Sequence, residues 1–218
     1  MSRFVLVTGT DTGVGKTVTT AALAVLHESR DDHVVVVKPV QTGVAEGEGG
    51  DLGAITRLTG LNEVQEFARL RAPLAPDSAA RIEGVTLPTI AETAERIRRI
   101  SADVVIVEGA GGLLVRLDLA GGTMLDLALA LGGDVVVVGR EGLGTLNHFA
   151  LTVDKLRAHG IEPELVLGSC SSKPGLAERS NHEEVPRVTG RPIVGRIPGG
   201  AGRLSREDFR AQAPGWFL

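Results

Sequence analysis

Short runs of apolar residues, rich in valine, recur along the chain, and within each run the apolar positions do not alternate with polar ones. Strands that are covered on both faces show this pattern, and coverage on both faces is typical of parallel sheets. Turn residues bound each run and keep it at strand length. We therefore expect buried strands at residues 4–7, 34–37, 104–107, 135–138, 165–167 and 193–194.

Segments long enough for helices separate these runs, at residues 16–29, 89–100, 124–131, 145–159 and 176–185. Strands that alternate with helices predict right-handed crossovers and a helix–sheet–helix sandwich. Residues 43–50 are rich in glycine and predict a flexible loop, and because strands continue on both sides, it is better interpreted as an active-site loop than as a domain boundary. Since we find no repeat and no linker, we expect residues 1–218 to form a single α/β domain with a mostly parallel central sheet.

The composition indicates a globular chain with a sizeable core, because 43% of the 218 residues are hydrophobic and the mean hydropathy is +0.14. The one cysteine, Cys170, cannot form a disulfide within the chain, which fits a reducing compartment. The apolar runs are far shorter than the ~20 residues of a membrane helix, and the N-terminal residues lack the features of a signal peptide. We expect a soluble cytoplasmic protein that does not bind a membrane.

The charge balance argues against nucleic acid as a partner. The formal net charge is −4 and the pI about 5.8, whereas proteins that bind phosphate backbones usually carry a basic surplus. Aromatic residues make up 3% of the chain and tyrosine is absent from the sequence, so a platform for stacking bases is not expected.

A glycine-rich segment follows the first predicted strand and opens the first predicted helix. Residues 9–17 read GTDTGVGKT, one residue longer than the strict P-loop pattern because Thr10 stands where the first glycine is usual. Backbone N–H groups of such a loop converge on phosphate oxygens, Lys16 can reach the β- and γ-phosphates, and the Thr17 hydroxyl can ligate Mg²⁺. An ordinary turn with a solvated Lys16 is the alternative, but the flanking strand and helix favour a three-layer domain like that of P-loop NTPases.

Charged residues also stand at the ends of two later strands. Lys38 opens KPVQTG at residues 38–43, and Glu108 lies within VVIVEGAGG at residues 104–112. Ligands of open α/β sheets bind at the carboxyl ends of the strands, so we expect both side chains near Lys16, with Glu108 as a Mg²⁺ ligand. The alternative is that both face water at strand ends. Asp51 is either a third acidic group on the metal or the N-cap of a helix.

Residues 139–148, GREGLGTLNH, follow another buried strand and open a helix. The free N–H groups at such a helix start can bind an anion. An ordinary loop with Thr145 as the helix N-cap explains the segment equally well, and both interpretations stay open on these residues alone.

These motifs, taken together and in this order, resemble those of the dethiobiotin synthetases, which are ATP-dependent cyclo-ligases of biotin synthesis. The resemblance runs from Phe4 to about Pro198 and rests on GTDTGVGKT, KPVQTG, APLAPDSAARIEG at residues 72–84, VEGAGG and GLGTLNH. It implies a homodimer that forms a carbamate from CO2 and 7,8-diaminononanoate, activates the carbamate with the γ-phosphate of ATP, and closes a ureido ring.

The resemblance also implies roles for individual residues. Lys16, Lys38 and Thr12 would be catalytic, and Thr17, Asp51 and Glu108 would hold Mg²⁺. The nucleotide would be bound by Gly13, Val14, Gly15, Lys16, Thr17, Glu108, Gly109, Ala110, Gly111, Gly168, Ser169, Ile197, Pro198 and Gly199. The substrate would be bound by Lys38 and Thr42 and, from the other subunit, by Gly144, Thr145, Leu146 and Asn147.

One departure from the family concerns the nucleotide base. Ser169 stands where the family usually has an asparagine that reads the adenine edge, and a hydroxyl cannot make the paired donor and acceptor contacts of an amide. We therefore expect relaxed base selectivity, with CTP and other nucleoside triphosphates competing well against ATP.

Two other classes of protein match the sequence less well. A switch ATPase of the ParA/MinD type carries a signature lysine in its loop, but alignment on Lys16 places Asp11 there. The chain also lacks a basic amphipathic terminal helix for a membrane surface. An amidating ligase such as a cobyrinate enzyme carries a glutaminase domain, for which 218 residues leave no room.

Overall fold

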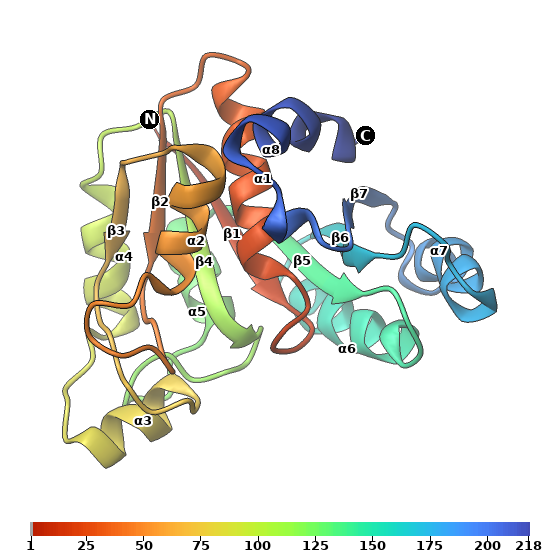
Figure 1. The fold of residues 1–218 in the computed structure, drawn as a ribbon. Coiled ribbons are helices and arrows are strands. Elements are labelled where there is room, and N and C mark those ends of the chain that lie inside the picture. Colours follow the sequence, from red (N-terminus) through yellow and green to blue (C-terminus); the bar gives the residue numbers. More distant parts are fainter. Residues whose placement is uncertain (1) are drawn as a thin grey trace.

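A seven-stranded sheet forms the centre of residues 2–218, the part of the chain that the computed structural model describes (Figure 1). The spatial order is β3-β2-β4-β1-β5-β6-β7, and neighbouring strands pair in parallel. The mostly parallel central sheet is therefore confirmed. Its strands are β1 (Arg3–Gly9), β2 (Val34–Lys38), β3 (Val64–Glu66), β4 (Val104–Gly112), β5 (Asp134–Arg140), β6 (Glu164–Cys170) and β7 (Ile193–Pro198).

Helices cover both faces of this sheet and complete three layers (Figure 1). Alternate residues of a strand point to opposite faces, so Val5 packs in one apolar cluster and Leu6 in the other. The first cluster contains α1 (Lys16–Glu28), α2 (Gly50–Thr59) and α8 (Arg206–Gln212). The second contains α4 (Ile90–Arg98), α5 (Met124–Leu131), α6 (Thr145–Arg157) and α7 (Leu176–Thr189).

The remaining elements lie outside these two layers. Helix α3 (Pro76–Glu83) projects beyond the sheet and packs over a small separate cluster that includes Val40 and Leu70 (Figure 1). Two short 3₁₀ segments, Ala201–Arg203 and Ala213–Trp216, flank α8. Among residues 2–218, no helix combines the length and the apolar character that crossing a bilayer requires.

The structure adds elements that the hydrophobic pattern did not predict. Strand β3 is three residues long and lies at the sheet edge, too short to give a periodic signal. Helix α2 begins directly after the glycine-rich loop, and α3 buries few apolar side chains. Helix α7 runs past Pro186 to Thr189, beyond the predicted end, because one missing N–H near the last turn does not stop it and Gly190 still donates to the Pro186 carbonyl.

The strand order brings the predicted motifs to one edge of the sheet. Strand β1 lies between β4 and β5, so the loop after β1 sits where crossovers leave to both sides. Lys38 ends β2 beside β4, which carries Glu108. Because the strands are parallel, their carboxyl ends meet at the same edge, which is where α/β proteins bind ligands.

Candidate active site

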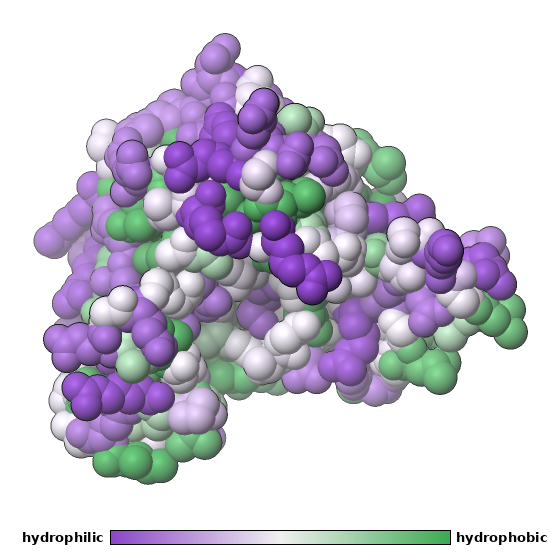
Figure 2. Space-filling model, viewed as in Figure 1, coloured by the Kyte–Doolittle hydropathy of each residue, from purple (hydrophilic) through white to green (hydrophobic). Residues whose placement is uncertain are grey.

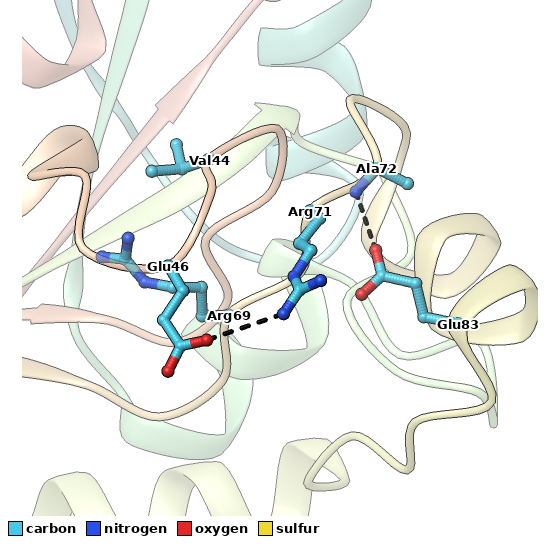
Figure 3. Close-up of a pocket in the computed structure, with 6 residues that line it drawn as sticks. All are labelled: Val44, Glu46, Arg69, Arg71, Ala72 and Glu83. Carbon is cyan, nitrogen blue, oxygen red and sulfur yellow. Dashed lines mark hydrogen bonds and ion pairs between the residues drawn. The ribbon is translucent and has the colours of Figure 1, made fainter.

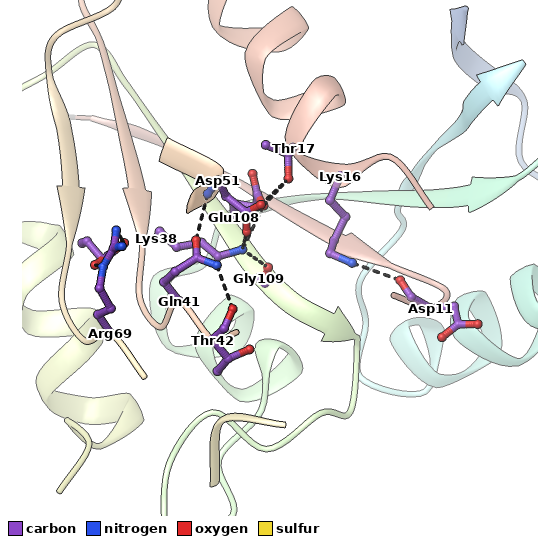
Figure 4. A network of polar contacts seen from close by, with 11 residues as sticks. Asp11, Lys16, Thr17, Lys38, Gln41, Thr42, Asp51, Arg69, Glu108 and Gly109 are labelled. Carbon is purple, nitrogen blue, oxygen red and sulfur yellow. Dashed lines mark hydrogen bonds and ion pairs between the residues drawn. The ribbon is translucent and has the colours of Figure 1, made fainter. Parts of the chain in front are cut away.

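The P-loop turns sharply from β1 into α1. Gly15 is the N-cap of α1 with a φ of 101°, a left-handed conformation that glycine adopts without strain, and no side chain caps the helix. The first N–H groups of α1 are therefore free to bind an anion. Lys16 is buried and its Nζ donates to the carbonyl oxygen of Asp11 at 3.0 Å, so the loop itself holds this lysine (Figure 4). Burial, and then the charge of Lys38, lower the pKa of Lys16.

Lys38 lies between two carboxylates at the centre of the site (Figure 4). Its Nζ is 2.6 Å from Asp51 Oδ2 and 2.8 Å from Glu108 Oε1, and it also donates to the carbonyl of Gly109 at 2.9 Å. The Thr17 hydroxyl lies 2.9 Å from Asp51 Oδ1 and 3.0 Å from Glu108 Oε1, and its one hydrogen can be donated to either. Residues from β2, β4, α1 and α2 thus form one polar cluster.

The charged side chains in this cluster shift one another's pKa values. Burial acts to lower the pKa of Lys38, but the charges of Glu108 and Asp51 outweigh it and the pKa is raised. Burial raises the pKa of Glu108, and Lys38 only partly opposes this. Burial acts to raise the pKa of Asp51 as well, yet the charge of Lys38 and the hydrogen bonds from Lys38 and Thr17 lower it overall. Lys38 is therefore protonated at neutral pH and places one positive charge between the two acidic groups that share it.

The cluster has the donor chemistry for a hard divalent cation. Thr17, Asp51 and Glu108 present hydroxyl and carboxylate oxygens, the ligands that Mg²⁺ takes in proteins. Glu108 Oε2 is buried and, within residues 2–218, has no hydrogen-bond partner, which is costly for a carboxylate oxygen. A cation beside this oxygen would satisfy it, so the residues present fit Mg²⁺. Asp51 lies in the first turn of α2, whose N-cap is Gly49, so the expected alternative of an Asp51 N-cap is wrong.

A cavity of about 930 Å³ opens above this cluster, a size suited to a small-molecule ligand. Its walls come from the P-loop, the KPVQTG segment, the end of β4 and the residues that lead into α3. The predicted site residues that line it are Thr12, Gly13, Gly15, Lys16, Thr17, Lys38, Thr42, Asp51, Glu108, Gly109, Ala110 and Gly111.

Two positioning residues were not singled out from the sequence. Gln41 is buried, and its Oε1 accepts the backbone N–H of Asp51 at 2.9 Å while its Nε2 donates to the Thr42 carbonyl. Arg69 binds Glu66 and donates to the carbonyls of Ala45 and Glu48, so it fastens the loop that leads to Asp51. Gln41 lies inside the KPVQTG motif and could have been found there. Glu66 is only three residues from Arg69, but no local signal predicts the contacts of Arg69 with the loop, because Ala45 and Glu48 are 24 and 21 residues away.

A second cavity, of about 820 Å³, adjoins the first through Val44 (Figure 3). Arg69, Arg71, Glu46 and Glu83 line it, so its charge is mixed. The Arg71 guanidinium lies 3.6 Å from Glu46, and Glu83 accepts the backbone N–H of Ala72 at 2.7 Å. The first contact ties the glycine-rich loop to the segment before α3, and the second ties that segment to the end of α3.

The ends of β6 and β7 approach the P-loop on its other side. A Cβ on Gly168 would lie 1.9 Å from the carbonyl oxygen of Val14, so only glycine fits this contact. Ser169 follows with a φ of 58°, and the Gly199 N–H donates to the Cys170 carbonyl at 2.6 Å. The predicted base-binding residues of β6 and β7 therefore lie together. The side chains of Val14 and Ile197 are buried in the core, which leaves only their backbones to meet a ligand.

Residues 144–147 do not line the cavity of the same chain. Gly144 is the N-cap of α6, so the alternative with Thr145 as N-cap is wrong. The Thr145 hydroxyl instead donates to the Arg140 carbonyl at 2.6 Å. Asn147 is exposed on α6 and faces away from the protein core.

Comparison with known proteins is consistent with this site. The sequence pattern of a family described as an AAA domain matches residues 3–201. An ATP-dependent dethiobiotin synthetase BioD of Rhodococcus jostii strain RHA1 is 51% identical, over 97% of this chain and 93% of that protein. The protein of the same name from Streptomyces coelicolor is 47% identical, over 97% of this chain and 90% of that protein.

Solved structures with a similar fold have little sequence identity to this chain. The septum site-determining protein MinD of Pyrococcus horikoshii OT3, complexed with Mg-ADP, superimposes with a TM-score of 0.60 at 14% identity, over 99% of this chain and 91% of that chain. Chloroplast FtsY from Physcomitrella patens gives a TM-score of 0.56 at 18% identity, over 98% of this chain and 65% of that chain. At such identities the likeness concerns the fold, and it confirms the predicted three-layer architecture.

Proposed function

The chain belongs to the dethiobiotin synthetase family of ATP-dependent cyclo-ligases, and from this premise we propose that it carboxylates 7,8-diaminononanoate with CO2 and closes the ureido ring, releasing ADP and phosphate. The observation that carries the proposal is the position of Lys38, held by Asp51 and Glu108 at the floor of a cavity that the P-loop also lines. A lysine there lies beside the expected place of the γ-phosphate, where a carbamate must be brought.

The proposed reaction has three steps. An amine of the substrate adds to the carbon of CO2 and loses a proton, which gives a carbamate. A carbamate oxygen then takes the γ-phosphoryl group from ATP, and ADP leaves. The second amine attacks the carbamoyl carbon and loses a proton, phosphate leaves with the bonding electrons, and the ring closes. In each step the protein needs only to position the reactants and to supply positive charge, and no step requires a nucleophile from the protein.

The residues of the site can supply that positioning and charge. Lys16 would leave the Asp11 carbonyl to reach the β- and γ-phosphates, while Lys38 stabilises negative charge on the carbamate and the phosphoryl group. Thr12 and the P-loop backbone would hold the phosphates, and Thr42 the substrate. Bound at Thr17, Asp51 and Glu108, Mg²⁺ would neutralise phosphate charge. We propose that the predicted nucleotide-binding residues at the ends of β6 and β7 contact the base. They are Gly168, Ser169, Ile197, Pro198 and Gly199.

The proposed homodimer would bring Gly144 to Asn147 into the partner's site. Exposed leucines support this: Leu143 is 82% exposed and Leu151 is 64% exposed, and Figure 2 shows apolar surface at the end of the molecule where α6 and α7 lie. Asn147 and Leu151 are four residues apart on α6 and share a face. A partner that covers Leu151 would therefore also meet Asn147. A single domain over residues 1–218 and a cytoplasmic location complete the proposal.

Phosphate release from ATP tests the proposed substrate. The assay contains Mg²⁺ and bicarbonate and is run with and without 7,8-diaminononanoate, on the wild type and on Lys16→Ala, Lys38→Ala and Lys173→Ala. Lys173 is exposed and serves as the matched control. We expect release that requires the diamine, is lost in the first two variants and is kept in the third. Release that ignores the diamine would refute the substrate assignment and favour a switch ATPase.

A further inference from the structure

A mixed cluster of side chains lies outside the candidate active site. Glu141 directly follows β5, Cys170 ends β6, and His182 belongs to α7. One carboxylate oxygen, the thiol sulfur and one imidazole nitrogen of these residues all lie within 4.8 Å of one another. The three residues are distant in the sequence, and the fold alone brings their ligand-type atoms together.

The protein around the cluster holds the carboxylate in place. Glu141 is buried, and its Oε1 lies 2.8 Å from His182 Nε2. Its Oε2 accepts the backbone N–H of Ser171 at 2.7 Å. Asn181, also buried, donates from Nδ2 to the carbonyls of Glu141 and Gly142 at 2.9 and 3.1 Å. Supporting hydrogen bonds of this kind orient the ligands in metal sites.

The environment of Cys170 argues against a reactive thiol. Burial, and then the Glu141 carboxylate, raise the pKa of Cys170 to about 12, so without a metal the thiol keeps its proton. Nucleophilic and redox-active cysteines need the opposite shift, since the thiolate is the reactive form. A purely structural hydrogen bond between Glu141 and His182 accounts for those two residues, whereas the Cys170 thiol beside them makes one long contact, of 3.5 Å, to the Leu167 carbonyl.

We propose that Glu141, Cys170 and His182 bind a zinc-type divalent cation, with a fourth position left to water. Sulfur, imidazole nitrogen and one carboxylate oxygen form a donor set that Zn²⁺ accepts in tetrahedral sites, whereas Mg²⁺ prefers oxygen ligands alone. On binding, Cys170 releases its thiol proton to solvent and the sulfur becomes the ligand. The site is separate from the Mg²⁺ cluster of Thr17, and it does not depend on the proposed reaction.

The position of this site gives it a structural consequence. The Cys170 carbonyl accepts the N–H of Gly199, and Cys170 follows Ser169 directly. A cation held by Cys170 would therefore fasten the end of β6 to α7 beside the proposed base-binding residues.

Cobalt and zinc titrations of the full-length protein test the proposal. The protein is freed of metal and titrated with Co²⁺ in excess Mg²⁺, which occupies oxygen-only sites. Cys170 is the only cysteine in the sequence, so absorption from thiolate-to-cobalt charge transfer reports on this residue alone. We expect the band to saturate at one equivalent, to be reversed by Zn²⁺ and to vanish in Cys170→Ser. A wild type without the band, or a band that survives in Cys170→Ser, would overturn the proposal.

A second variant keeps the test valid if Cys170→Ser does not fold. We expect His182→Ala to weaken Zn²⁺ binding by roughly a hundredfold or more, measured by competition with a chromogenic chelator. His159→Ala is the matched control, because this exposed histidine lies just after α6 and its side chain hydrogen-bonds the Lys155 carbonyl, away from the cluster. Equal zinc affinities of His182→Ala and His159→Ala would contradict the site even if cobalt binds. Circular dichroism of each variant verifies that it is folded.

Discussion

Lys38 is 3% exposed, and its ammonium group contacts two carboxylates that belong to different elements, α2 and β4. Water cannot replace this ammonium at Glu108, whose side chain is fully buried. Removing one partner of a buried ion pair leaves an uncompensated charge, which costs more than the pair itself contributes. Lys38 therefore has a structural role alongside the proposed catalytic one.

We predict that Lys38→Met lowers the free energy of unfolding by about 3–5 kcal/mol in the absence of nucleotide and metal. Mg²⁺ should restore part of this loss, because it brings positive charge back to Glu108 and Asp51. Urea unfolding with and without Mg²⁺ measures both effects, and Lys173→Met is the control. A loss below about 1 kcal/mol, the range of an exposed ion pair, would show that Lys38 does not compensate a buried charge.

Ser169 combines an unusual backbone conformation with the departure from the family. Its φ of 58° lies in the left-handed region, where asparagine is several-fold enriched among non-glycine residues. The backbone thus accepts the family's asparagine without strain, and the serine differs from it chiefly in the hydrogen bonds that its side chain offers.

We predict that Ser169→Asn raises the kcat/KM for ATP relative to that for CTP by roughly tenfold. A change of this size corresponds to the net free energy of one to two hydrogen bonds. Competition between the two nucleotides measures the ratio in the wild type and in the variant. Strong preference for ATP in the wild type, or an unchanged ratio in Ser169→Asn, would refute the expected relaxed selectivity.

The contact between the P-loop and the end of β6 joins two elements that are far apart in the sequence. Val14 and Gly168 touch backbone to backbone, so the path of the loop depends on how closely β6 approaches it. Gly53, by contrast, lies inside α2, and a methyl group added there would meet no atom within 4 Å. These glycines offer a matched comparison of a required glycine and a dispensable one.

We predict opposite effects of alanine at these positions. Gly168→Ala should destabilise the protein by about 1–3 kcal/mol through overpacking and should weaken ATP binding, because the P-loop must move. Gly53→Ala should stabilise it by about 0.5–1 kcal/mol, since alanine is the better helix former. Thermal unfolding and equilibrium binding of ATP measure the two effects. If Gly168→Ala is as stable as the wild type, the close contact with Val14 is wrong.

At the scale of the whole molecule, four of the predicted substrate contacts, residues 144–147, lie outside the cavity of their own chain. Within one chain the site is therefore incomplete if residues 144–147 bind the substrate. The apolar surface around Leu143 and Leu151 offers a place for a second copy, since large exposed apolar patches often mark interfaces.

We predict that Leu143→Glu combined with Leu151→Glu converts a dimer into a monomer and abolishes ring closure while the fold is kept. Ile82→Glu is the control, because Ile82 is 71% exposed on α3, outside the α6 face. Light scattering coupled to size-exclusion chromatography gives the mass of each variant. A monomeric wild type, or a double variant that stays dimeric, would contradict the proposed interface.

Local patterns along the chain were enough to predict the main strands, the P-loop and the positions of Lys38 and Glu108. Parallel strands buried on both faces have an apolar signal that needs no knowledge of neighbours, and the GKT order is read directly. The carboxyl ends of such strands share one edge, so Lys16, Lys38 and Glu108 could be expected together before their distances were known.

Other features depend on which elements become neighbours, and no short-range pattern encodes that. The N–H of Asp51 donates to Gln41 Oε1, which holds Asp51 in the first turn of α2 instead of at its N-cap, and Arg69 holds the glycine-rich loop through the carbonyls of Ala45 and Glu48. Glu141, Cys170 and His182 lie on three separate elements and show no ligand spacing in the sequence. They meet only because β5 and β6 are adjacent and α7 packs beside α6, which the burial of apolar surface across the whole chain decides.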